Sequence, residues 1–126
     1  MISSAQHCYL EQTDVKREPT TWQQYICEIT EWERTLLHHN WETNTSSLSA
    51  VLQDENAKVM AVSDGGQIGD IGTFGWVIGT ESEILWEGQG AACGQPMTSH
   101  RAEAYGKLAW LCFLKHYIIF LNLQVR

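Results

Sequence analysis

The sequence has little positive charge. Its 126 residues include 8 lysines and arginines against 15 aspartates and glutamates, which gives a formal net charge of −7. A protein that only binds nucleic acid is usually basic, because contacts with phosphates supply most of its affinity. The charge therefore argues against a stand-alone nucleic-acid-binding module. It stays compatible with an enzyme that holds nucleic acid through metal ions.

The chain also lacks the cysteine spacing of a zinc finger. It contains no C-x-x-C pair and no histidine at zinc-finger distance from its cysteines, which are Cys8, Cys27, Cys93 and Cys112. We therefore expect all of them to be reduced thiols, in the core or at the surface.

No apolar run is long enough to cross a bilayer. The run from Tyr117 to Leu121 falls far short of the roughly 20 residues that a membrane helix needs. The N-terminus also lacks the basic and then apolar pattern of a signal peptide. We expect a soluble, intracellular protein without a membrane partner, in either the nucleus or the cytoplasm.

What the chain does contain predicts one globular domain. The hydrophobic fraction is 44% and the charged fraction 18%, and six tryptophans argue against disorder. Residues 1–19 are polar and aperiodic and end at a proline, which predicts a flexible tail or linker. Residues 20–57 are expected to form a connector helix and loop, and residues 58–126 the main domain.

The connector is predicted to be a single helix over residues 20–40. Apolar residues recur on one face at helical spacing, at Trp22, Tyr25, Ile26, Ile29, Trp32 and Leu36. Charged residues lie largely off this stripe, at Glu28, Glu31, Glu33 and Arg34. Thr21 and Gln24 fit a capping box at its start. Residues 41–56 are expected to be a loop with at most a short turn of helix.

The stretch from residue 58 to residue 114 organises the rest of the chain. It predicts an antiparallel meander of three strands, at residues 58–63, 72–80 and 84–92. The first strand is almost continuously apolar and is expected to end at Asp64, Gly65 and Gly66. The next residues, 67–71, are expected to form a hairpin loop.

A long helix is predicted after the meander, which makes the fold class α/β. Thr98 or Ser99 can cap it, and the helix can continue to about Leu121. Its apolar face is broad and suits a core position, with Ala102, Tyr105, Leu108, Ala109, Cys112 and Phe113. Glu103 lies near its start.

Asp64 and Glu103 set the functional question, because a strand end and a helix start can bring two carboxylates together. Mg²⁺ prefers oxygen ligands and keeps several waters, so two carboxylates with a substrate phosphate form a normal site. Each acid also has a structural interpretation, as a turn former and as a favourable charge at a helix N-terminus. His38 and His39 are a poorer metal pair, since adjacent helical residues point about 100° apart.

A family resemblance is carried by SDGG at residues 63–66, TFGWVI at residues 73–78 and SHRAEAYG at residues 99–106. Together these segments look like the N-terminal half of the ribonuclease H domain of a retroelement reverse-transcriptase polyprotein, over roughly residues 58–114. The helix with Trp32-Glu33-Arg34 resembles, more weakly, the connector that precedes this domain in such polyproteins.

The resemblance implies an incomplete ribonuclease H-like fold, in which a three-stranded meander is followed by a long helix. It also implies hydrolysis of the RNA strand of RNA–DNA hybrids with Mg²⁺ or Mn²⁺. Asp64 and Glu103 match the first two catalytic, metal-binding acids of the family. The third and fourth have no counterpart, and Asp70 is expected to be a turn residue. We therefore expect weak metal binding and little or no activity from this chain.

Gly65, Gly66, His100 and Arg101 are candidate substrate contacts. His100 and Arg101 precede Glu103 and can contact a phosphate, although a capping or surface role suits these two better. The resemblance also implies an RNA–DNA hybrid as the partner of the complete domain and a reverse-transcriptase domain upstream. The strand at residues 58–63 would then have an open edge, which predicts self-association.

Two alternatives remain beside the nuclease. The chain can be a non-catalytic protein-interaction fragment that uses the connector helix and the open sheet edge. A phosphate-binding domain like those of actin and sugar kinases also opens with a strand, an Asp, two glycines and a hairpin. It needs a second phosphate loop and an adenosine site, for which 126 residues leave no room.

Aromatic residues raise a further choice between core and surface. Trp76 and Trp86 can stack on a nucleic acid, but a place in the core is the commoner use of strand aromatics. Trp110, Phe113 and Leu114 are candidates for exposure, because the long helix would lack partners for part of its apolar face.

Overall fold

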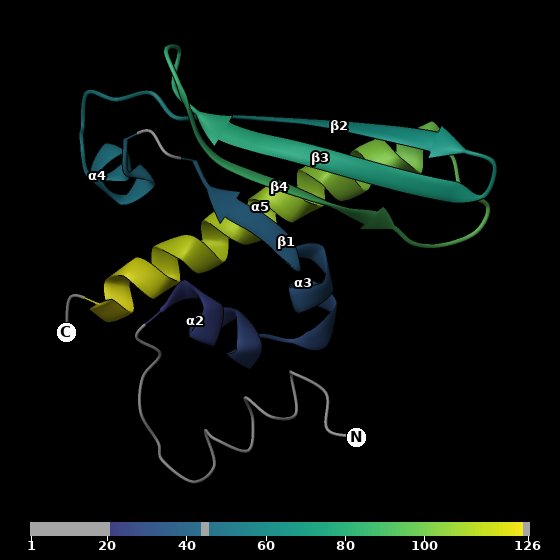
Figure 1. Cartoon of the computed structure of the whole chain (residues 1–126), viewed down its shortest axis with the longest axis horizontal. Coiled ribbons are helices and arrows are strands. Elements are labelled where there is room, and N and C mark those ends of the chain that lie inside the picture. The colour runs from purple at the N-terminus through teal and green to yellow at the C-terminus, as the bar shows by residue number, and fades with distance from the viewer. Residues whose placement is uncertain (1–20, 44–45, 125–126) are drawn as a thin grey trace, which may run out of the picture.

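The computed structural model describes residues 21–43 and 46–124 (Figure 1). The predicted tail at residues 1–19 lies outside the described residues. The elements follow one another as α2 (Trp22–Glu28), α3 (Glu31–Leu36), β1 (His39–Glu42), α4 (Leu48–Leu52), β2 (Met60–Ile68), β3 (Ile71–Gly79), β4 (Ile84–Ala92) and α5 (Ser99–Gln124).

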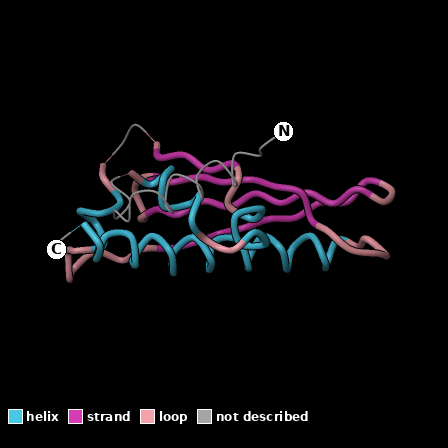
Figure 2. Tube along the Cα trace, turned by 90° about the horizontal axis from the view of Figure 1, so that it is seen from below, coloured by secondary structure: helices cyan, strands magenta, loops and turns pink. Residues whose placement is uncertain are grey.

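The fold has two layers, a sheet and a long helix. The sheet has four antiparallel strands in the order β1-β4-β3-β2. The helix α5 runs along one face of this sheet, as Figure 2 shows edge-on. The α/β class and the meander followed by a long helix are therefore confirmed, whereas the expected count of three strands is wrong.

The additional strand, β1, arises because the connector is not a single helix. After α2, Ile29 has an extended backbone with φ −80° and ψ 169°, and the helix ends there. A second short helix, α3, begins at Glu31, and the chain then enters β1 instead of continuing as a helix to Asn40. In β1, His39 lies opposite Gln89 of β4.

Asn40 explains why this unpromising sequence forms a strand. Its Oδ1 accepts hydrogen bonds from Trp22 Nε1 at 2.9 Å and from Trp86 Nε1 at 3.0 Å. Its Nδ2 donates to the backbone oxygen of Leu37 at 2.6 Å. These bonds tie β1 to α2, to β4 and to the end of α3. The apolar pattern of residues 38–42 does not predict these hydrogen bonds.

The strand β2 is longer than predicted. It continues past Asp64 and both following glycines, and its last residue, Ile68, pairs with Ile71 of β3. Only Gly69 and Asp70 form the turn, where Gly69 has a positive φ of 60° that glycine adopts without a Cβ penalty. Asp64 therefore lies inside a strand at an edge of the sheet, not at a strand end. Asp70 is a turn residue, as expected.

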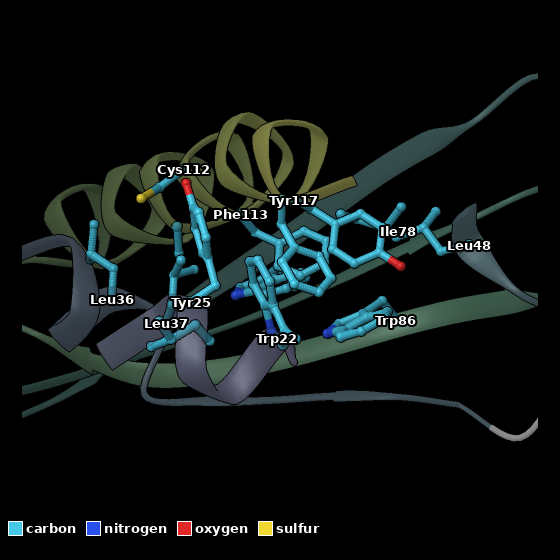
Figure 3. Packing of buried hydrophobic residues seen from close by; sticks show 14 of the residues in the cluster. Trp22, Tyr25, Leu36, Leu37, Leu48, Ile78, Trp86, Cys112, Phe113 and Tyr117 are labelled. Atoms are coloured by element: carbon cyan, nitrogen blue, oxygen red, sulfur yellow. The ribbon is translucent and has the colours of Figure 1, made fainter. Parts of the chain in front are cut away.

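Aromatic side chains fill the space between α5 and the sheet (Figure 3). Phe113 of α5 is fully buried, with its ring centroid 4.9 Å from that of Trp76, 5.1 Å from Trp86 and 5.4 Å from Trp22. Burial of one such side chain contributes about 2–3 kcal/mol. The two strand tryptophans thus belong to the core, as preferred, and the expected exposure of Phe113 is wrong.

The connector packs against the same core. Trp22, Tyr25 and Leu36 are buried, as the helical stripe predicted. Trp32 is not, with 57% of its surface exposed, because the break at Ile29 takes α3 out of register with α2. Residues 41–56 also contain the short helix α4, whose Leu48 is fully buried.

The start of α5 matches the sequence. Thr98 caps it, since Thr98 Oγ1 accepts a hydrogen bond from the backbone of Arg101 at 3.1 Å. Trp110 and Leu114 are half-buried. Large apolar side chains are exposed elsewhere on this helix, at Leu108, Leu111, Ile118 and Ile119. Among the described helices, none has the length and apolarity that a membrane crossing requires.

The cysteines differ from one another in state. Cys93 and Cys112 are free thiols, the first exposed and the second buried. Cys27 is disulfide-bonded, so the expectation that all cysteines are reduced is wrong at this position.

Gly65 fixes how closely β2 and α5 approach each other. A Cβ atom at this position would lie 2.4 Å from the backbone carbon of Ala102 and 2.4 Å from the backbone nitrogen of Glu103. Since both neighbours are backbone atoms of a helix, no side-chain rotation can relieve such a clash. The strand and the helix are therefore in direct backbone contact here.

We expect Gly65→Ala to destabilise the fold by about 3 kcal/mol, because an added methyl group must push β2 and α5 apart. The matched control is Gly66→Ala in the same strand, where a Cβ would meet nothing within 4 Å. The control should be neutral or slightly stabilising, since glycine in a strand interior costs about 0.5–1 kcal/mol relative to alanine. Denaturant unfolding of both variants checks this, and equal stabilities would contradict the proposed contact.

Candidate functional site

Asp64 lies at the free edge of the sheet. Among the described strands, β2 pairs only with β3, so its other side carries no ladder. Asp64 Oδ1 accepts a hydrogen bond from the backbone nitrogen of Gly65 at 2.9 Å. The bond ties the carboxylate to the backbone of its own strand.

Glu103 approaches the same edge from the helix layer. Gly65 packs on the backbone of Ala102 and Glu103, and Ser63 packs on Gly106 one helical turn further along α5. Side chains alternate between the two faces of a strand, so Asp64 belongs to the face turned away from α5. The carboxylate of Asp64 and the exposed residue Glu103 therefore flank the edge of β2 from two sides.

The face of the sheet turned away from α5 carries a groove of about 760 Å³. Asp64 is part of its wall, together with Trp41, Val62, Thr73, Glu87 and Gln89. Trp41 Nε1 donates a hydrogen bond to Glu87 Oε2 at 3.0 Å across β1 and β4. This acidic wall suits a cation better than a phosphate.

The predicted substrate contacts are not tested by the structure, which gives only the position of each residue in the fold. Gly65 has a packing role, and Gly66 lies beside it with open space around its Cα. His100 and Arg101 are exposed in the first turn of α5, and Arg101 lies over Gly94 in the preceding loop.

The edge offers few ligands to a metal. Across residues 21–43 and 46–124, one group alone brings three or more His, Cys, Asp or Glu ligand atoms within 4.8 Å of one another, and neither Asp64 nor Glu103 belongs to it. The adjacent rings of His38 and His39 are in contact, with centroids 4.4 Å apart, but they have no third ligand in that part of the chain either. An ion at the β2 edge would depend on two carboxylates, water and substrate oxygens.

The one group of three potential metal ligands among the described residues is buried between the connector and α5, and the sequence patterns did not predict it. It consists of Glu33 from α3 with Cys112 and His116 from α5. Glu33 Oε2 lies 2.8 Å from His116 Nε2 and 3.5 Å from Cys112 Sγ. The spacing of Cys112 and His116, one helical turn apart, was the available signal. Glu33 gave no such signal, because it lay off the apolar stripe of the predicted helix. That helix is in fact broken at Ile29.

Further polar groups complete this network. Lys115 Nζ donates to Glu33 Oε2 at 3.1 Å, and Thr30 Oγ1 donates to Glu33 Oε1 at 2.7 Å. On the other side of the imidazole, His116 Nδ1 lies 2.7 Å from Tyr25 Oη. A buried carboxylate with partners on both oxygens is held in place, and it fastens α3 to α5.

These surroundings shift the pKa values of the network. Burial by itself would raise the pKa of Glu33, but hydrogen bonds from Thr30, His116 and Lys115 outweigh it and lower the pKa to about 2. Burial, followed by the negative charge of Glu33, raises the pKa of the Cys112 thiol to about 12. Burial also raises the pKa of Tyr25. The carboxylate is thus ionised at neutral pH, while the thiol keeps its proton.

Comparison of the chain with protein-family models, with curated proteins and with solved structures finds no match. The chemistry of both sites therefore rests on the geometry of their own residues.

The network predicts a specific loss of stability in acid. Because the pKa of Glu33 falls from 4.5 in the unfolded chain to about 2 in the fold, its ionisation stabilises the fold above pH 4.5. This stabilisation, about 3 kcal/mol, is lost as the pH falls from about 5 to about 2. Glu33→Gln should lower the free energy of unfolding at pH 7 and flatten its dependence on pH in this range.

The control is Glu31→Gln, an exposed position on the same helix. It should keep both the stability at pH 7 and the acid limb of the wild type. Urea unfolding at several pH values measures both effects. An unchanged acid limb in Glu33→Gln would show that another group controls the acid response.

Proposed function

We propose that this chain is part of a ribonuclease H-like nuclease domain which, when complete, hydrolyses the RNA strand of RNA–DNA hybrids with Mg²⁺ or Mn²⁺. The observation that carries the proposal is the contact of Gly65 with the backbone of Ala102 and Glu103. It joins the two motifs of the family resemblance, SDGG and SHRAEAYG, at one edge of the sheet. In this assignment Asp64 and Glu103 bind the first cation.

The reaction would follow from metal chemistry. Two divalent ions about 4 Å apart can activate a water molecule for attack on the phosphodiester and stabilise the leaving 3′ oxygen. An ion between Asp64 and Glu103 would hold a non-bridging phosphate oxygen of the RNA strand. It would also offset the negative charge of this chain toward the nucleic acid.

Catalysis also requires ligands for a second ion. Within the part of the chain that the structure describes, neither Asp64 nor Glu103 belongs to a group of three or more potential ligands. We therefore assign binding of one cation to this chain and hydrolysis to a domain that contributes the remaining acids. The same proposal includes a reverse-transcriptase domain upstream of this chain as a partner.

The first test is metal binding at the edge. Calorimetry with Mn²⁺ should show weak binding to the wild-type chain, because two carboxylates at an exposed edge give little preorganisation. Asp64→Asn and Glu103→Gln should each abolish the signal. The control Asp70→Asn, at the turn of the same hairpin, should leave it unchanged. Binding that survives both Asp64→Asn and Glu103→Gln would refute the site.

The second test is activity. The chain alone should cleave a labelled RNA–DNA hybrid no faster than background in Mg²⁺ or in Mn²⁺, since the described residues offer no set of ligands for a second ion. Robust cleavage that disappears in Glu103→Gln would confirm the family assignment. It would also overturn the view that this chain is inactive by itself.

A second candidate function, protein interaction, is favoured by the same edge. Among the described strands β2 has one unpaired side, and 45% of Met60 and 62% of Val62 are exposed there. An unpaired apolar edge is a template for another strand, including the β2 of a second copy.

Light scattering should accordingly show a concentration-dependent increase in mass for the wild-type chain. Val62→Lys should reverse this increase, because a charge on an edge strand opposes pairing. Leu111→Lys is the control, since Leu111 is 54% exposed on α5, away from the edge. Association lost only in the control would place the contact on the helix, and a wild-type monomer at all concentrations would exclude pairing through β2.

A further inference from the structure

We propose that Glu33, Cys112 and His116 form a binding site for a transition-metal ion of the zinc type. Their ligand atoms, one carboxylate oxygen, one sulfur and one imidazole nitrogen, all lie within 4.8 Å of one another. This site is separate from the β2 edge and uses different chemistry. It does not depend on the proposed nuclease function.

The distances are close to those that tetrahedral zinc requires. Zinc binds nitrogen and oxygen at about 2.0 Å and sulfur at about 2.3 Å, which places ligand atoms roughly 3.3–3.8 Å apart. Cys112 Sγ and Glu33 Oε2 are already 3.5 Å apart. His116 Nε2 and Glu33 Oε2 are 2.8 Å apart and must separate by roughly half an ångström to admit the ion. Small rotations of the two side chains accomplish this.

The backbone holds the three ligands in position. Cys112 and His116 lie one turn apart on the same face of α5. The residues that follow each of them, Phe113 and Tyr117, are buried in the aromatic core, so this part of the helix cannot turn. On the other side, α3 is anchored by the buried Leu36. Such preorganised donors distinguish a site from a chance cluster.

Outer contacts are also those of a metal site. A histidine that binds metal through one ring nitrogen usually hydrogen-bonds through the other, and here His116 Nδ1 lies 2.7 Å from Tyr25 Oη. The second carboxylate oxygen, Glu33 Oε1, accepts from Thr30 Oγ1 at 2.7 Å. With a metal on Nε2, the imidazole carries its proton on Nδ1, and this N–H donates a hydrogen bond to Tyr25 Oη.

The ligand set selects the metal. Sulfur and imidazole nitrogen favour zinc and its analogues over Mg²⁺ and Ca²⁺, which prefer oxygen. On binding, the Cys112 thiol releases one proton to solvent, and the imidazole binds the ion through Nε2. The thiolate and the Glu33 carboxylate then balance the two charges of the ion.

Lys115 competes with the ion. Its ammonium donates to the same Glu33 oxygen at 3.1 Å, but 60% of the side chain is exposed. It can therefore turn into solvent when a metal arrives. The alternative state is the hydrogen-bonded network without metal, in which Lys115 and the protonated thiol remain on Glu33.

Cobalt(II) tests the proposal by a spectroscopic signature. The chelator-treated chain, with the disulfide of Cys27 intact, is titrated with CoCl₂. Tetrahedral coordination with a thiolate gives a sulfur-to-cobalt charge-transfer band and intense d–d bands. The wild type should show both, and added ZnCl₂ should remove them. Cys112→Ser should lose the charge-transfer band. Cys93→Ser is the matched control, since Cys93 is a free but exposed thiol. This variant should keep the charge-transfer band.

Two further variants keep the result interpretable if Cys112→Ser fails to fold. Tyr25→Phe preserves the ring and should weaken cobalt binding by about 10- to 100-fold, as loss of an outer-sphere partner does. Lys115→Gln should strengthen binding, because the competing cation is gone. A folded wild-type chain without these bands would overturn the proposal, as would a charge-transfer band lost in Cys93→Ser and kept in Cys112→Ser.

Discussion

The direct backbone contact of β2 with α5 is the constraint on which the rest of the structure depends. A strand and a helix approach this closely only where a side chain is missing, and Gly65 and Gly106 supply the two gaps. The contact fixes the line along which α5 crosses the sheet. That line in turn places Phe113 among the tryptophans and brings Glu103 to the edge where Asp64 lies. Core and candidate site therefore share one cause.

The second attachment of α5 is polar. Glu33 reaches it from α3 through His116, Cys112 and Lys115, and Asn40 joins the same connector to the sheet through two tryptophan side chains. Buried polar groups with satisfied partners specify one arrangement, whereas apolar contacts alone tolerate several. The connector thus belongs to the core of this domain, and its orientation is set by few, directional bonds.

The two cation sites that we propose differ in every respect that governs metal choice. The β2 edge offers exposed carboxylate oxygens, which suit Mg²⁺ or Mn²⁺ and leave room for water and a phosphate. The cluster at Glu33 offers sulfur, nitrogen and oxygen in a buried setting, which suits zinc and a structural role. The first site would serve the proposed chemistry on nucleic acid, and the second would fasten the connector to α5.

The sequence by itself determined the elements that periodicity and capping encode. It predicted the meander, the long helix with its Thr98 cap, and the turn at Asp70, because local side-chain patterns and turn residues decide these features. It did not predict β1, which depends on the bonds of Asn40 to residues far along the chain. Nor did it predict the extension of β2 through Asp64, since pairing with β3 overrides the weak strand preference of two glycines. The cluster of Glu33, Cys112 and His116 was decided by tertiary structure alone, because only the break at Ile29 and the packing of α3 on α5 bring it together.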